Sequence, residues 1–151
     1  MGTFKSRLQT DLTEAIRARD ELRSSTLRLT LTAVTNEEVA GKEARELSDA
    51  EVLKIVVREA KKRREAAEAF ELGGRAESAA RERAEGEILA EYLPKQLDDA
   101  ELKGIVAAAI AETGASGPSA MGQVMKVVRP KVGDRAEGGR IAAEIKSQLG
   151  S

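Results

Sequence analysis

Positive charge and glycine are concentrated in one short stretch near the C-terminus of the sequence. The segment Asp134–Glu137 resembles a capping box, which predicts that a helix begins there. Free N–H groups and the positive end of such a helix attract anions, and an RNA backbone supplies phosphates. We expect the charged groups of Lys131, Arg135 and Arg140 to cluster around this helix end. The RNA-binding candidates are Lys126, Arg129, Lys131, Arg135, Arg140, Gly138 and Gly139.

The two glycines at the start of the predicted last helix have two alternative explanations. Inside a helix, Gly138 and Gly139 each cost roughly 0.8–1.0 kcal/mol relative to alanine, so some gain should offset them. One explanation is the close approach of a second helix. The other is the anion site at the helix end. The sequence leaves both open.

No catalytic site is visible in the chain. It contains no histidine and no cysteine, which excludes disulfides, thiolate metal sites and cysteine nucleophiles. The loop at 114–119 holds serines, but no base is placed to activate them. The neighbouring carboxylates at 37–38 and 98–99 do not face each other across a substrate, and helix caps or solvent explain them. We predict no catalytic residue, no metal ligand and no cofactor.

The elements that position these residues are predicted to be helices throughout. Of the 151 residues 34% are charged and 2% are aromatic, and strong helix formers are abundant. The stretch 27–32 alternates as a strand would, but its flanks favour a helix. Apolar spacing, caps and glycine stops predict helices over about 3–16, 20–40, 48–72, 76–92, 98–113, 118–129 and 134–149.

Pro94 marks the expected boundary between two parts of the chain. The residue before a proline is pushed out of helical geometry, and the helices become shorter beyond this point. The sequence therefore predicts an all-α protein with a long-helix N-terminal domain, 1–94, and a compact three-helix C-terminal subdomain, 95–151.

Arg63 occupies an unusual position in the predicted third helix. Helical spacing places it in a seam with Val56, Ala60, Ala67 and Phe70. A guanidinium there either reaches past the edge of the core or pairs with a carboxylate. We expect a buried pair, with Glu37 or Glu38 on the preceding helix as the partner. The basic run at 61–64 lies among glutamates and is interpreted as a solvated face.

Charge and hydropathy narrow the environment of the protein. The formal net charge of −1 argues against wholesale attraction to nucleic acid or membranes, so any phosphate contact must be local. The N-terminus has no apolar signal-peptide core, and no stretch approaches 18 uninterrupted apolar residues. We expect a cytoplasmic protein that does not enter a membrane.

Several stretches of the sequence resemble the GatB/Yqey family. They include 22–29, 36–38, 62–65 and the Tyr-Leu-Pro at 92–94, followed by Met-Gly at 121–122 and the glycine-rich turn at 133–138. The C-terminal third is similar to the tail of the B subunit of tRNA-dependent amidotransferases. This resemblance implies a helical module that contacts tRNA, and a link to glutamine-dependent amide transfer, a carbon–nitrogen ligase activity. The resemblance does not identify a catalytic residue in this chain.

Two functional hypotheses follow. In the first, the protein binds tRNA, or docks to a tRNA-handling enzyme, through its C-terminal subdomain. In the second, it is a protein–protein adaptor that uses its N-terminal helices and does not bind RNA. The sequence leaves the oligomeric state open.

Overall fold

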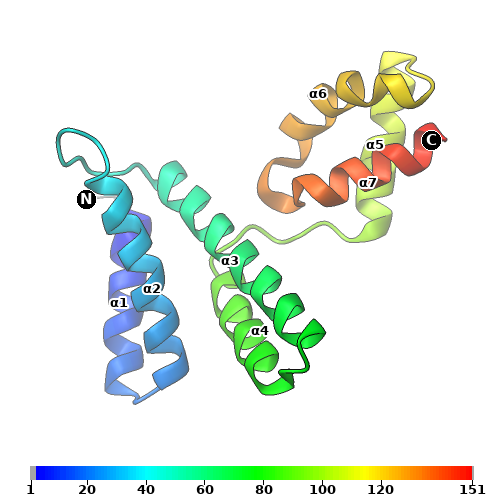
Figure 1. The fold of residues 1–151 in the computed structure, drawn as a ribbon. Coiled ribbons are helices and arrows are strands. Elements are labelled where there is room, and N and C mark those ends of the chain that lie inside the picture. The colour runs from blue at the N-terminus through cyan, green and yellow to red at the C-terminus, as the bar shows by residue number, and fades with distance from the viewer. Residues whose placement is uncertain (1–2, 151) are drawn as a thin grey trace. The chain divides into compact units, whose positions relative to one another are not determined.

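The described part of the chain, residues 3–150 of a computed structural model, consists of helices joined by turns and loops. These residues form seven α-helices and two 3₁₀ helices and contain no strand (Figure 1). The prediction of an all-α fold is confirmed. Within residues 3–150, no helix is long and apolar enough to cross a membrane. Contacts divide the chain into an N-terminal unit, Met1–Leu93, and a C-terminal unit, Pro94–Ser151.

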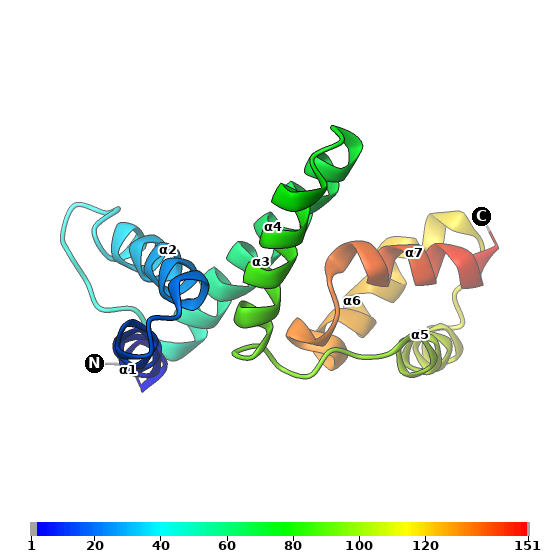
Figure 2. The ribbon, with the colours of Figure 1, turned by 90° about the horizontal axis from the view of Figure 1, so that it is seen from below.

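Two helical hairpins make up the N-terminal unit. In each hairpin the helices lie side by side and run in opposite directions, as both views of the ribbon show (Figures 1 and 2). The first hairpin consists of α1 (Thr3–Arg17) and α2 (Glu21–Glu38), and the second of α3 (Asp49–Leu72) and α4 (Ala76–Ala90).

The helix starts of this unit follow local sequence signals. Asp20 caps α2 by accepting a hydrogen bond from the backbone N–H of Arg23 at 3.0 Å. Ser48 and Glu51 form a capping box at the start of α3, where the sequence predicts that a helix begins. The turn between α1 and α2 places Arg19 in the left-handed region, with φ of 59°. The capping signals fix the starts of α2 and α3 before any tertiary packing is considered, whereas α4 begins without a side-chain cap.

The apolar core of the N-terminal unit lies where α3 begins and α4 ends. Along the rest of the second hairpin the contact is made by small residues. Ala67 and Ala79 are fully buried, and a Cβ added at Gly86 would lie only 3.7 Å from the Cβ of Arg63. The buried residues of the core are Leu8, Leu27, Val34, Leu47, Val52, Ile55, Val56, Leu89 and Tyr92.

Three α-helices surround the core of the C-terminal unit. Asp98 and Glu101 form a capping box at the predicted start of α5, and Gly114 ends that helix in the left-handed conformation. The helices are α5 (Asp99–Thr113), η1 (Pro118–Ala120), α6 (Met121–Val132), η2 (Gly133–Arg135) and α7 (Gly138–Leu149). Their core consists of Leu97, Leu102, Val106, Ala109, Val124, Val128, Val132, Ala136, Ile141 and Ile145.

Two predicted helix ends in this unit are wrong. The helix expected to stop at Pro130 continues to Val132, which is buried in the core. A proline in the last turn removes only one hydrogen bond of the helix, and burial of the Val132 side chain offsets that loss. The capping box expected at Asp134–Glu137 is also absent, because residues 133–135 form η2 and Ala136 is extended and buried. Glu137 is therefore the N-cap residue of α7, and its side chain makes no capping hydrogen bond.

Candidate nucleic-acid interface

Lys126 and Arg129 lie on the solvent-facing side of α6. The opposite side of this helix buries Val124, Val128 and Val132, so residues at 126 and 129 must point outward. Among the described residues of the C-terminal unit, ion pairs are made by Lys131 and Arg140 but not by Lys126 or Arg129. A phosphate could therefore approach either cation without displacing a carboxylate.

The guanidinium of Arg129 reaches the first residue of α7. A Cβ added at Gly138 would lie 3.5 Å from Arg129 Nη2, and one added at Gly139 would meet no atom within 4 Å. The close helix–helix contact proposed for these glycines is therefore wrong, since the only neighbour is a flexible side chain at Gly138. The exposed glycines instead leave the backbone N–H groups of the α7 N-terminus open to solvent beside a cation.

Lys131, Arg135 and Arg140 each have an acceptor of their own inside the C-terminal unit. Lys131 Nζ lies 2.9 Å from a carboxylate oxygen of Glu112 on α5. Arg140 Nη2 lies 3.1 Å from Asp99 Oδ1 at the start of α5. Arg135 donates to the backbone carbonyl of Lys131 at 2.6 Å and so caps the C-terminus of α6. These three side chains therefore make polar contacts within the unit, whereas Lys126 and Arg129 make no ion pair among the described residues.

Comparison with known protein families shows to which family the chain belongs. Residues 5–149 match the family described as Yqey-like protein. The chain belongs to the Yqey-like family. No curated protein sequence matches it. The match covers both units, so the N-terminal hairpins are as much a part of this Yqey-like protein as the basic surface of α6.

The expected partner of Arg63 is wrong. Arg63 Nη1 lies 3.4 Å from carboxylate oxygens of both Glu82 and Glu85 on α4. Glu38 instead accepts a bond from Lys5 at 2.9 Å, and Glu37 is exposed. The physical reason is the closeness of α3 and α4, which brings the carboxylates of α4 to the Arg63 side chain.

The surroundings of Arg63 are polar although they are largely buried. Glu85 and Glu59 are 5% and 8% exposed, and Arg63 Nε is buried without a hydrogen-bond partner among residues 3–150. A small cavity of about 10 Å³ adjoins them, lined also by Thr26 and Thr30 of α2. This volume is close to the minimum for one water molecule, so the cluster is a structural ion-pair network and not a ligand site.

Sequence reasoning missed the role of Tyr92 in the Yqey-like protein. Its hydroxyl donates to Asp11, and its ring lies 6.3 Å from that of Phe4 and 4.5 Å below the guanidinium of Arg7. Burial, followed by the hydrogen bond to Asp11, raises the pKa of Tyr92. The two hydrogen-bonded residues are 81 positions apart, and no local pattern points from one to the other.

A cleft beside Tyr92 carries the wrong charge for RNA. It has a volume of about 370 Å³. Its charged lining consists of four carboxylates, Asp11, Glu14, Asp20 and Glu91, and two guanidinium groups, Arg7 and Arg23. Arg23 is already bound to Glu91 at 2.8 Å. Negative charge therefore prevails in this cleft, and phosphate is repelled there.

Proposed function

We propose that this Yqey-like protein binds tRNA through the exposed surface formed by Lys126, Arg129 and the N-terminus of α7. The observation that supports this most directly is that Arg129 makes no ion pair among the described residues and lies against Gly138. A cation beside open backbone N–H groups is a suitable phosphate-binding arrangement. Because the formal net charge of the chain is −1, attraction to RNA must come from this local surface and not from the protein as a whole.

The proposal extends to the setting in which the module acts. Resemblance to the amidotransferase tail connects it to glutamine-dependent amide transfer on charged tRNA in the cytoplasm. In that setting the chain positions tRNA or a tRNA-handling enzyme and another protein performs the carbon–nitrogen ligation. Its own contribution is binding.

Salt-dependent tRNA binding tests the proposal. The charge-reversal pair Lys126→Glu with Arg129→Glu should weaken binding and make the slope of log K against log salt less negative by about 1.4–1.8, because each phosphate contact contributes roughly 0.7–0.9. The matched control is Lys95→Glu with Lys103→Glu, which makes the same charge change at two exposed lysines of the same unit. Equal slopes in the two double variants would show that only net charge matters and would refute the proposed surface.

The sequence also suggests a charge-reversal variant in which glutamate replaces Lys131, Arg135 and Arg140. The structure makes this triple variant less informative. Their partners are Glu112, the end of α6 and Asp99. A loss of binding in that triple variant would therefore combine the loss of three cations with the loss of these contacts within the unit.

A second candidate function, a protein–protein adaptor, has one observation in its favour. Leu29 on α2 is 51% exposed, Val39 directly after α2 is 57% exposed, and Leu72 at the end of α3 is 92% exposed. Large exposed apolar side chains are common at contact surfaces but also occur singly on ordinary surfaces. If the wild-type protein shows no salt-dependent binding of tRNA, the adaptor function is the better explanation.

A further inference from the structure

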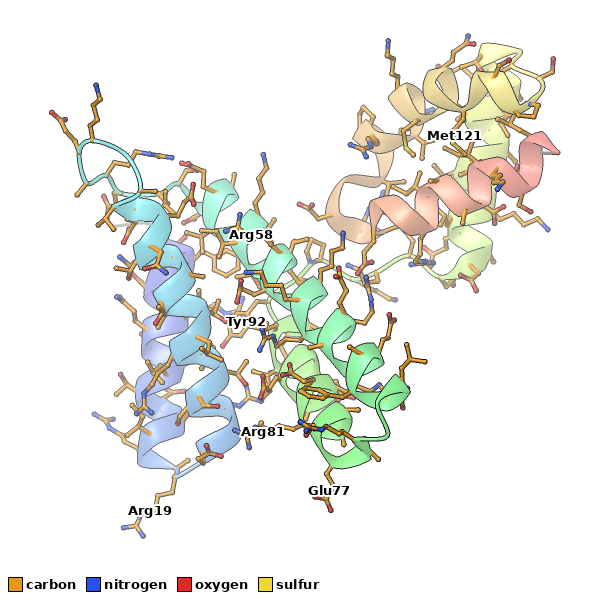
Figure 3. All side chains as sticks on the ribbon, viewed as in Figure 1. Arg19, Arg58, Glu77, Arg81, Tyr92 and Met121 are labelled. Atoms are coloured by element: carbon orange, nitrogen blue, oxygen red, sulfur yellow. The ribbon has the colours of Figure 1, made fainter. Side chains whose placement is uncertain are left out.

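The C-terminal unit contains an apolar pocket that the RNA-binding proposal does not use. One wall is formed by η1 and the start of α6, and the other by the last turn of α7. The pocket is lined by Pro118, Met121, Lys146 and Leu149. Its volume is about 300 Å³. Met121, which is labelled in Figure 3, and Leu149 are half-buried residues at the edge of the core. The pocket is thus a place where the apolar interior opens to solvent.

Several features of the backbone hold the two walls of this pocket in place. Pro118 and Met121 are three residues apart, and so are Lys146 and Leu149, so each pair lies on one helical face. Gln148 donates to the backbone carbonyl of Lys103 at 3.0 Å and ties the last turn of α7 to α5. Gly150 then ends α7 in the left-handed conformation. The pocket is therefore preformed, which lowers the entropic cost of filling it.

The rim of the pocket has a positive charge without a partner. Lys146 is exposed, makes no ion pair within residues 3–150, and no acidic residue lines the pocket. A pocket of this size is at the lower end for small-molecule sites, and it accommodates one bulky side chain more readily than a long acyl chain. The matching ligand has one bulky apolar group and a carboxylate about one helical turn away.

We propose that this pocket binds an amphipathic helical segment of a partner protein. A leucine or phenylalanine of the partner fills the space between Met121 and Leu149, and a glutamate one turn earlier pairs with Lys146. Helix-in-groove recognition uses such anchors at i and i+4. This inference is independent of tRNA binding, which uses Lys126, Arg129 and the other end of α7.

Designed peptides and methyl NMR on the full chain test the docking site. The probe is a helical peptide of about 14 residues with a central leucine and a glutamate four positions before it. The chain has three methionines, so ¹³C-methyl-methionine spectra are simple, and Met121→Leu assigns the relevant signal. The expected result is saturable movement of the Met121 signal, abolished when serine replaces the peptide leucine.

A charge swap identifies the role of Lys146. Wild type should prefer the glutamate peptide to one with lysine at that position by about three- to ten-fold, the range expected for an exposed ion pair replaced by a like-charge contact. Lys146→Glu should reverse this preference, while Lys103→Glu, the matched control, should preserve it. A Met121 signal that no peptide moves, or a preference that Lys146→Glu leaves unchanged, would overturn the proposal. Tighter binding of decanoate or anionic vesicles than of every peptide would also overturn it and would assign the pocket to a lipid.

Discussion

Arg63 should be the costliest cation of the N-terminal unit to remove. Arg63→Ala leaves Glu82 without its cation and Glu85 with only Arg81, which lies 3.2 Å away. Breaking a fully buried pair costs about 3–5 kcal/mol. The Arg63 side chain is 22% exposed and Glu85 keeps a second partner, so we expect a smaller loss, about 2–3 kcal/mol. For a unit of this size that loss lowers the melting temperature by roughly 8–24 °C.

Urea and thermal unfolding followed by circular dichroism measure this loss. Lys61→Ala is the matched control on the same helix, because its pair with Glu65 is long, 3.9 Å, and both side chains are about 60% exposed. That control should stay within about 0.5 kcal/mol of wild type. Adding Glu82→Gln to Arg63→Ala should restore part of the lost stability, since an uncompensated carboxylate is removed. An Arg63→Ala variant as stable as the control would refute the assignment of a buried network.

Three further predictions concern the fold. Hydrogen bonding from Arg45 lowers the pKa of Glu51 from 4.5 to about 2. On acidification the unfolded chain therefore binds a proton at Glu51 before the folded protein does, and the free energy of unfolding should fall as the pH drops from 4.5 to about 2. The variant Glu51→Gln, which can keep the capping box, should show a smaller fall in urea titrations at acid pH. Tyr92→Phe should cost about 1 kcal/mol, because it removes the hydrogen bond to a partly exposed Asp11, and an unchanged urea midpoint would contradict this. A fragment of residues 94–151 should unfold cooperatively on its own, because every residue of its core lies between Leu97 and Ile145, and a fragment without a thermal transition would show that it needs the N-terminal unit.

Local signals in the sequence account for most of the helices. Ser48 with Glu51 and Asp98 with Glu101 are capping boxes whose partners are three residues apart, so the sequence contains the whole interaction. The end of α5 at Gly114 is equally local, because only its left-handed conformation is needed. Pro130 and Asp134 misled the prediction for the opposite reason. Burial of Val132 and Ala136 decides the backbone there, and burial depends on the other helices.

Pairing between helices could not be predicted in the same way. Periodicity correctly indicates that Arg63 faces a neighbouring helix, but it does not say which of the many glutamates is opposite. The choice depends on α3 packing closely on α4 through Ala67, Ala79 and Gly86. The bond between Tyr92 and Asp11 is of the same kind, since it joins α1 to the end of α4.

Contacts between helices also change the interpretation of the basic stretch near the C-terminus. In the sequence, its five cations are equivalent candidates for phosphate. In the structure, Lys131 and Arg140 neutralise carboxylates of α5, and Arg135 satisfies backbone carbonyls at the end of α6. A cation already bound inside the fold must exchange one partner for another, so its net gain from a phosphate is small. Lys126 and Arg129 have no such exchange to make, and for that reason the proposal of tRNA binding places most of the binding energy on these two side chains.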